Sequence, residues 1–389
     1  MRAIIIAVLA ATATATATMA QPGAAPPVVS WEVPAEPGIV ARPWAAGLEN
    51  PWSIAFLPDG RALVTERPGR LRIISRDGRV GPPVAGVPKV LVAGQGGLLD
   101  VALHPDFARN GLVYLTHAVG TPTANMTALS RGRLSGNMLT DVKELFRNPT
   151  PKNGGAHFGS RLLWLPDGTL LMSVGDGGNP PFRLDGKFIR EQAQNGKTCF
   201  GKVLRVTADG LPVRSNPGVL NPKLGWDSRV WSIGHRNIQG LTRDAATGTI
   251  WATEHGARGG DELNRLAAGG NHGWPIVTYS IEYSGKPITS ERSRPGFRDP
   301  VSVWVPSIAP SGLLVYRGKA LPALNGVILA GGLASGDIRF IRLRADGRPA
   351  TETRLPIEAR VRDIRMSPEG IVHVLTDEPE GRILRLAAE

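Results

Sequence analysis

The chain has 389 residues, of which 42% are hydrophobic, and its 45 Lys and Arg against 33 Asp and Glu give a formal net charge of +12. This length and hydrophobic content are enough for a large core, and a single cysteine excludes an internal disulfide. The 48 glycines and 33 prolines are typical of a turn-dense β protein, with no long amphipathic helical stretch.

The N-terminal segment has the pattern of an export signal. Residues 1–20 combine a short positive start, an apolar core and a tract of small residues, which predicts a secretory signal peptide too short to span a membrane. Residues 21–40 are predicted to be a Pro-rich lead-in, and residues 41–389 one folded domain. For a bacterial protein this signal predicts the periplasm.

A hairpin pattern recurs along the rest of the chain: an apolar run, a turn with Gly, Asp or Asn, and a second apolar run. Recurrence of one such unit predicts an all-β, six-bladed β-propeller, whose ring we expect the N-terminal segment to close with a last strand. The six copies are Ile54–Glu66, Val101–His117, Leu162–Asp176, Leu241–Gly256, Ala320–Leu333 and Ile364–Glu378.

The copies are unevenly spaced. A bare blade needs roughly 40–50 residues, so the surplus is expected in loops, concentrated in residues 179–240 and 271–310. Long loops on a rigid scaffold commonly carry binding and chemistry. A pair of β-sandwiches is the alternative, but it would not be expected to repeat one hairpin pattern six times.

The positive charge is spread along the chain without a basic run or interleaved aromatics, which argues against a nucleic-acid partner. A compact anionic ligand in a basic pocket fits better, because arginines recur at expected loops and strand ends. These arginines are Arg236, Arg258, Arg360, Arg362 and Arg365.

Residues 234–275 concentrate groups suited to a hard cation. Glycines free backbone carbonyls to turn inward, and Glu254, Asp261 and Glu262 supply carboxylates, a combination that suits Ca²⁺. The spacing does not match an EF-hand. From the residues alone, an acidic turn with solvated carboxylates is the favoured interpretation.

His157 and Gln95 are the candidates for a reactive site. His157 precedes the third hairpin after a glycine pair, and Gln95 occupies the equivalent lead-in of the second hairpin. Equivalent positions in adjacent blades face the same end of the propeller axis, and histidine can take a proton near neutral pH. A lone histidine is more often a packing or surface residue, so both interpretations stay open at this point.

Taken together, the motifs resemble those of the soluble aldose sugar dehydrogenases, relatives of soluble quinoprotein glucose dehydrogenase. The resemblance covers nearly all of residues 45–388, in order. It implies a six-bladed propeller that holds pyrroloquinoline quinone (PQQ) over its axis with Ca²⁺ bound to the quinone, and oxidation of aldose sugars at C1 to lactones. The motifs are GQGGLL, HFGSRLLWLPDG, GHRNIQG, EHGARGGDELN, NHGWP and RVRDI.

The resemblance implies a role for several residues. His157 matches the base that takes the proton from the anomeric hydroxyl while hydride passes to the quinone. Arg236 and Asn237 match the pair beside the quinone, with Arg236 also stabilising charge on its oxygen. Gln95 matches a cofactor-contacting glutamine, and Tyr283 an aromatic near the ring plane.

Two further segments match cofactor contacts. Arg360 and Arg362, which flank Val361, match the paired arginines that hold the quinone carboxylates. The segment formed by Gly332, Leu333 and Ala334 stands where the family often has Ala-Leu-Lys, so a cationic contact to PQQ is missing.

Two calcium sites are also implied. The carbonyls of Gly256 and Ala257 match ligands of the quinone-bound Ca²⁺, and Glu262 with the carbonyl of His272 matches a second, structural site. Ala257 stands where proline is common and His272 where tyrosine is frequent, and a main-chain ligand survives both changes.

Two other classes of function remain as alternatives: a propeller that binds a sugar or partner without turnover, and a Ca²⁺-dependent lactonase on the same fold. The lactonase would not need the arginine pair, and a pure binding module would not need His157, Gln95 and Arg236 together. The expected partners are an aldose and an unidentified electron acceptor, with no nucleic acid, no membrane span and a monomer or weak dimer.

Overall fold

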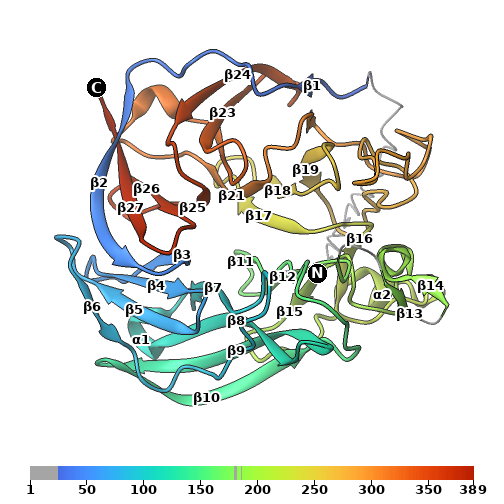
Figure 1. Ribbon diagram of the computed structural model, residues 1–389. Helices are drawn as coiled ribbons and strands as arrows, with labels where there is room; N and C mark the ends of the chain where they lie inside the picture. Colours follow the sequence, from blue (N-terminus) through green and yellow to red (C-terminus); the bar gives the residue numbers. More distant parts are fainter. Residues whose placement is uncertain (1–24, 179–181, 185) are drawn as a thin grey trace, which may run out of the picture.

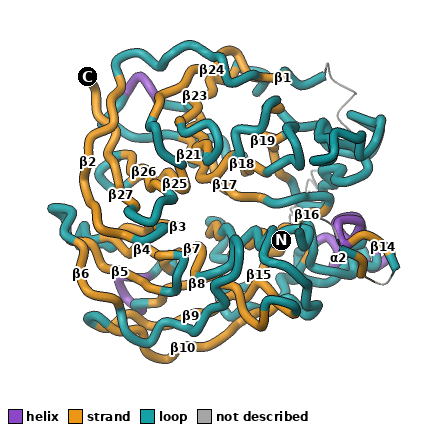
Figure 2. Tube along the Cα trace, viewed as in Figure 1, coloured by secondary structure: helices purple, strands orange, loops and turns teal. Residues whose placement is uncertain are grey.

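The computed structural model describes residues 25–389 apart from 179–181 and 185, so the predicted signal peptide lies outside the described residues. Within this part of the chain, the strands form six sheets of four or five strands arranged around a central axis (Figure 1), which confirms the predicted six-bladed propeller. Strands and loops make up nearly all of the trace (Figure 2). None of the helices in the described part is long and apolar enough to cross a membrane.

Each blade is an antiparallel sheet whose first strand contacts the first strands of both neighbouring blades, so these six strands surround the axis. Five of the six predicted hairpins form the two inner strands of a blade. From the axis outwards the blades are β3 (Pro51–Phe56), β4 (Ala62–Glu66), β5 (Arg70–Ile74), β6 (Val80–Pro83); β7 (Leu98–Leu103), β8 (Leu112–Thr121), β9 (Ala124–Ser135), β10 (Met138–Arg147); β11 (Leu162–Trp164), β12 (Leu170–Val174), β15 (Lys202–Val206), β16 (Val230–Ile233); β17 (Ile238–Arg243), β18 (Ile250–Glu254), β19 (Asp261–Leu266), β20 (Ser302–Trp304), β1 (Val28–Val29); β21 (Pro310–Val315), β22 (Ile328–Gly332), β23 (Asp337–Leu343), β24 (Pro349–Pro356); and β25 (Val361–Met366), β26 (Val372–Thr376), β27 (Gly381–Ala388), β2 (Ile39–Leu48).

The fifth predicted hairpin is wrong in its first half. Residues 320–327 form no strand, because Pro322 begins a short 3-10 helix instead, and the first strand of the blade is β21, which lies before this segment. The Tyr316 hydroxyl holds the intervening loop by accepting a hydrogen bond from the Leu321 N–H at 2.9 Å. The second half is confirmed as β22.

The remaining elements are short and lie in the connections between strands. As predicted, the longest connections fall between β12 and β16 and between β19 and β21. The short elements found in all the connections are β13 (Arg183–Leu184), β14 (Lys187–Phe188), α1 (Phe107–Asn110), α2 (Pro217–Leu220), η1 (Ile189–Gln194), η2 (Pro222–Leu224) and η3 (Pro322–Leu324).

The N-terminal segment closes the ring, as expected. Strand β2 pairs antiparallel with β27 and completes the sixth blade, so the blue start and the red end of the chain lie side by side in Figure 1. The preceding lead-in also packs on the propeller, because β1 joins β20 in parallel and Glu36 forms an ion pair of 2.6 Å with Arg342.

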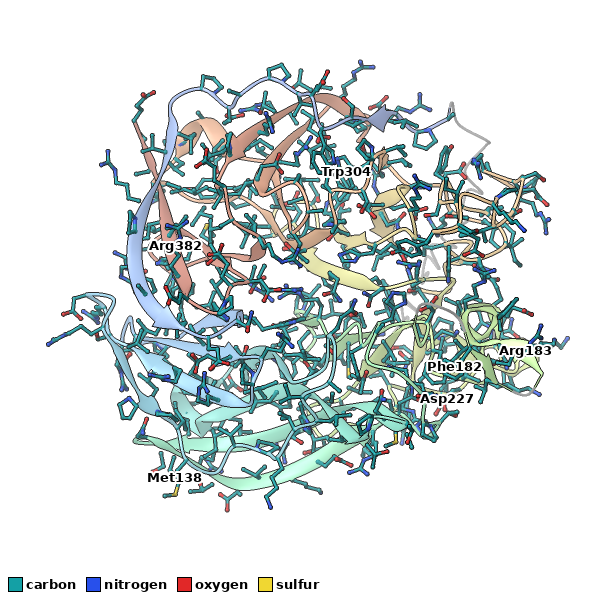
Figure 3. The ribbon with its side chains drawn as sticks, in the orientation of Figure 1. Met138, Phe182, Arg183, Asp227, Trp304 and Arg382 are labelled. Atoms are coloured by element: carbon teal, nitrogen blue, oxygen red, sulfur yellow. The ribbon has the colours of Figure 1, made fainter. Side chains whose placement is uncertain are left out.

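The hydrophobic core is divided between the blades. Each large cluster of buried side chains joins two neighbouring blades, and Trp304 (Figure 3), fully buried between the fourth and fifth blades, belongs to one of them. The six interblade clusters in the described residues bury the faces that a lone blade would leave exposed. Neighbouring blades therefore depend on one another for the burial of their apolar faces.

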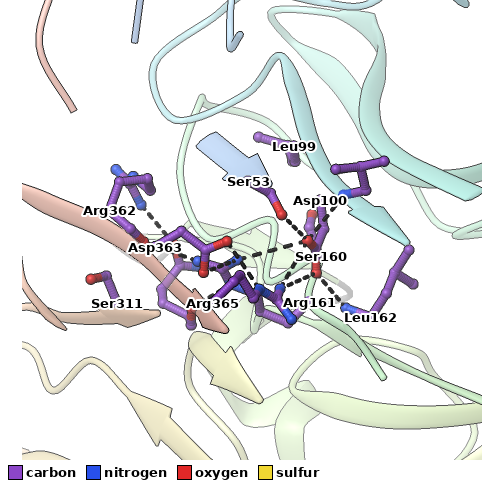
Figure 4. A network of polar contacts seen from close by, with 12 residues as sticks. Ser53, Leu99, Asp100, Ser160, Arg161, Leu162, Ser311, Arg362, Asp363 and Arg365 are labelled. Atoms are coloured by element: carbon purple, nitrogen blue, oxygen red, sulfur yellow. Dashed lines mark hydrogen bonds and ion pairs between the residues drawn. The ribbon is translucent and has the colours of Figure 1, made fainter. Parts of the chain in front are cut away.

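A network of buried ions ties the blades together at the axis (Figure 4). Arg161 on the third blade lies 2.9 Å from Asp363 on the sixth, and Arg365 lies 3.0 Å from Asp363 and 3.1 Å from Asp100 on the second. Asp100 also accepts hydrogen bonds from Ser53 Oγ and the Leu162 N–H. We call Asp100, Arg161, Asp363 and Arg365 the axis cluster.

Candidate active site

One end of the axis opens into a cavity of about 320 Å³ directly above the axis cluster. The Arg161 guanidinium of the cluster lies 4.2 Å from the ring of Trp52, which lines the cavity, and its Nη2 donates to the Arg362 carbonyl. All six blades contribute to the lining, through the starts of their first strands and the ends of their second strands. The lining residues are Asn50, Trp52, Arg67, Gly94, Gln95, Leu99, Phe158, Gly159, Gln239, His255, Ala309, Leu333, Arg360, Arg362 and Asp377.

His157 lies beside this cavity in the loop before β11. The loop is held tightly, because the His157 N–H donates to Gln95 Oε1 at 2.8 Å and a side chain at Gly175 would collide with the His157 carbonyl. The backbone of His157 has φ of 55°, a conformation that non-glycine residues adopt rarely and that often occurs at functional sites. His157 and Gln95, which we expected at the same end of the axis, thus lie in contact there.

A carboxylate that the sequence did not single out orients His157. The distance from His157 Nδ1 to Asp176 Oδ1 is 2.6 Å, and Asp176 Oδ2 accepts a hydrogen bond from Trp274 Nε1 at 2.8 Å. Burial opposes ionisation of Asp176, but His157 and Arg236 together hold the pKa of this carboxyl below its ordinary value. An ionised Asp176 fixes the proton on Nδ1 and leaves Nε2 of the imidazole able to accept one.

The pKa of His157 is itself lowered. Burial is the largest cause, the charge of Arg236 adds to it, and Asp176 acts in the opposite direction. The imidazole is therefore neutral near neutral pH, which is the state that a general base requires.

Arg236 and Asn237 connect the third and fourth blades at the cavity. Arg236 Nη1 donates to the His255 carbonyl at 3.0 Å and also to the Gly256 carbonyl, while Asn237 Oδ1 accepts the Gly159 N–H. Arg236 also shares a small recess with the His157 partner Asp176.

The cavity carries excess positive charge. Arg67, Arg360 and Arg362 line it against one carboxylate, Asp377, which forms an ion pair with Arg362. The side chain of Arg360 is 54% exposed, and, among the described residues, the buried Nε of Arg362 has no hydrogen-bond partner. Burial lowers the pKa of His255 to about 3, so this imidazole stays neutral. This donor set fits a compact polycarboxylate such as PQQ, because guanidinium groups bind carboxylates bidentately.

The residues implied for the quinone-bound Ca²⁺, Gly256 and Ala257, lie next to Arg236. The Gly256 carbonyl already accepts a bond from a cationic group, Arg236, and Ala257 lines the recess beside Asp176. This placement fits a cation held by main-chain oxygens. Within the described ranges, no group of three or more His, Cys, Asp or Glu side chains is arranged to hold a metal.

Glu262 and His272 are buried and are not among the residues that line the cavity. Glu262 is buried, and its pKa is raised well above the ordinary value by burial and by the neighbouring charge of Glu254. The two ring nitrogens of His272 are buried without a hydrogen-bond partner in the described part of the chain. A buried carboxylate with a raised pKa is an environment that a bound cation would stabilise.

The other implied cofactor contacts are distributed unevenly. Leu333 lines the cavity, whereas Ala334 is exposed in the turn that follows β22. The side chain of Val361 packs in the core between the fifth and sixth blades, and Gly332 ends β22. Tyr283 is 58% exposed. Of the arginines expected in a basic pocket, Arg360 and Arg362 line the cavity, whereas Arg365 belongs to the axis cluster. Neither Arg258 nor Tyr283 is among the lining residues of the cavity.

Sequence reasoning missed several groups at this site. Asp176 follows the second strand of the third hairpin in a Gly-Asp-Gly-Gly turn, a signal that could have indicated it, since inner strand ends meet at the cavity. Trp274 lies in the NHGWP motif, but that motif does not show that its indole contacts Asp176. Asp377 gave no comparable local signal, because ring closure brings it to the site.

The fold and this site define a class: a six-bladed propeller with a cationic axial cavity and a carboxylate-oriented histidine at its margin. The model of the glucose/sorbosone dehydrogenase family matches residues 48–385, and the chain belongs to this family.

Relatives support this assignment. The chain is 50% identical over 361 residues to the uncharacterized protein slr1608 of Synechocystis sp., covering 90% of this chain and 87% of the relative. It is 35% identical over 351 residues to the aldose sugar dehydrogenase YliI of Escherichia coli, covering 87% and 90%. The PQQ-bound aldose sugar dehydrogenase of Streptomyces coelicolor superposes with a TM-score of 0.72 at 29% identity, covering 92% of this chain and all of that one.

Proposed function

We propose that this protein oxidises aldose sugars at C1 to lactones, with PQQ and Ca²⁺ as cofactors. The observation that carries the proposal is His157, whose Nδ1 is 2.6 Å from Asp176 at the margin of a cavity lined by three arginines. The histidine supplies a base, and the arginines supply counter-charges for an anionic cofactor.

The residues act in distinct ways. His157 Nε2 accepts the proton of the anomeric hydroxyl, and Asp176 stabilises the imidazolium that forms. Arg360, Arg362 and Arg67 bind and orient the cofactor carboxylates, and Arg236 stabilises negative charge that develops nearby. When bound, PQQ supplies the two-electron acceptor for the hydrogen on C1, with Ca²⁺ as its Lewis acid.

The axis cluster argues against the lactonase alternative. A lactonase of the kind considered would hold its metal on side-chain ligands at the axis. The axial carboxylates Asp100 and Asp363 are instead engaged by Arg161 and Arg365. A binding module without turnover would have no need of the His157–Asp176 pair.

We further infer a setting for this activity. The signal-peptide pattern of residues 1–20 supports export to the periplasm. There, electrons from the sugar would pass to an acceptor that the sequence does not identify, from an enzyme that is a monomer or a weak dimer. Glu262 and the His272 carbonyl would hold the second, structural Ca²⁺.

Reconstitution tests the proposal. Purified protein should reduce an artificial dye with aldoses when both PQQ and Ca²⁺ are present, and chelation during reconstitution should abolish the activity. A methyl glycoside, which lacks the free anomeric hydroxyl, should not be oxidised. Equal activity without PQQ would overturn the proposal.

A further inference from the structure

Two buried lysines in the described part of the chain differ in what surrounds their ammonium groups. Lys202 is fully buried, and its Nζ donates to three carbonyls, those of Gln192, Ala193 and Phe200, at 2.6–2.9 Å. All three N–H donors of Lys202 are thereby satisfied by the backbone. This arrangement is that of a structural clamp.

Lys152 is 3% exposed and has a different environment. Its Nζ donates to one carbonyl, that of Gly154, at 2.8 Å, and lies 4.0 Å from the centroid of the Phe158 ring. Its backbone pairs in both directions with Asn125 at the start of β9, so the main chain at Lys152 is held against the second blade. The ammonium thus contacts the loop on both sides of His157.

The charges that act on Lys152 belong to the site. Burial lowers the pKa of both lysines to about 7, and for Lys152 the opposing influence is the charge of Asp176, the carboxylate that orients His157. In turn, the charge of Lys152 contributes to lowering the pKa of His157, together with Arg236. The ionisable groups coupled to Lys152 are therefore Asp176 and His157.

We propose that Lys152 is a positioning residue for the reaction: its buried ammonium braces the loop that carries His157 and keeps the imidazole of His157 unprotonated, so that it can act as a base. This inference rests on the proposed function, in which His157 must begin each cycle without a proton on Nε2.

The physical need for such a cation follows from Asp176. A carboxylate 2.6 Å from an imidazole stabilises the protonated form, which cannot accept a proton from a sugar hydroxyl. A second positive charge nearby opposes that protonation without disturbing the hydrogen bond that orients the ring. Lys152 and Arg236 are the cations placed to do so.

The test compares Lys152→Met, which removes the charge, with Lys152→Arg, which keeps it at all working pH values. Removal of a like charge should raise the pKa of His157, so the acidic limb of the pH–turnover profile should move to higher pH by roughly one unit in Lys152→Met. In Lys152→Arg the limb should stay in place or move to lower pH. If Lys152→Met is unstable, Lys152→Gln carries the same test, because it keeps a donor for the Gly154 carbonyl.

Lys202→Met is the matched control. Loss of three hydrogen bonds should lower its melting temperature, while the acidic limb should stay where it is in the wild type. An equal shift of the limb in Lys202→Met, or no shift in Lys152→Met, would overturn the proposal.

A second readout separates this inference from the proposed function. The His157 imidazole can be titrated by NMR in histidine-labelled protein, with its signal identified by its absence in His157→Ala. The titration midpoint should rise in Lys152→Met and not in Lys152→Arg, whether or not the protein oxidises sugars. An unchanged midpoint in Lys152→Met would contradict the role of Lys152 even if aldose oxidation is confirmed.

Discussion

The arginines of the axis cluster and those of the cavity above it differ in how far carboxylates balance them. In the axis cluster, Arg161 and Arg365 face Asp100 and Asp363, and both arginines are engaged by these carboxylates. In the cavity, Arg67, Arg360 and Arg362 face Asp377 alone. Arginine therefore has two roles along the axis: in the axis cluster it is paired with carboxylates, and in the cavity it remains partly available to a ligand.

This difference shows how structural arginines can be distinguished from ligand-binding arginines in a basic protein. A buried cluster with balanced charge is neutralised internally by its ion pairs and ties blades together. A cluster with excess positive charge that is open to solvent can remain without carboxylate partners until a ligand binds, and it favours an anionic ligand. Net charge alone, at +12, would not distinguish the two.

We expect the largest effect from His157→Ala, because a residue at the margin of the cavity should contribute to catalysis and little to the stability of the fold. Turnover with aldose should fall by about 10²–10⁴, the usual contribution of a positioned base. The melting temperature and PQQ affinity should change little. Turnover at the level of the wild type would place the base elsewhere.

In the axis cluster the expectation is reversed. Arg161→Met should lower the free energy of unfolding by about 3–5 kcal/mol, because it leaves buried carboxylates without their partner. The control is Arg61→Met, which removes an exposed ion pair with Asp59 and should cost about 0–1 kcal/mol. Denaturant unfolding measures both, and similar losses in the two variants would refute the structural role of the cluster.

The smallest expected effect is on cofactor affinity at the cavity rim. Ala334→Lys restores a cation next to the cavity-lining Leu333 and should tighten PQQ binding by about 10- to 150-fold, the range for a charge-assisted hydrogen bond. Arg360→Ala should weaken binding by removing such a bond. An absorbance titration with PQQ measures both. Unchanged affinity in the two variants would mean that the cofactor does not bind between these loops.

The sequence predicted the blades well because their signals are local. Turn residues between alternating apolar runs determine a hairpin over about a dozen residues, and five of the six predicted hairpins have both strands as expected. The fifth failed because an apolar run that contained Pro322 was assigned to a strand, although proline lacks the N–H that a strand needs.

The sequence by itself determined the propeller, since the repeated hairpins depend on short-range patterns. Closure of the ring by the N-terminal segment was expected from the architecture and joins residues far apart in the chain. The role of His157 as a base was implied by the family resemblance and stays a prediction. The tertiary structure alone decided what surrounds that base. Asp176 contacts His157, Trp274 contacts Asp176, and Lys152 contacts the loop that carries His157. Blade packing and long loops bring these residues together, and the sequence around each of them does not show which side chains it will contact. The tertiary structure likewise decided which arginines are paired with carboxylates, because burial and neighbouring side chains determine whether a guanidinium is engaged or available.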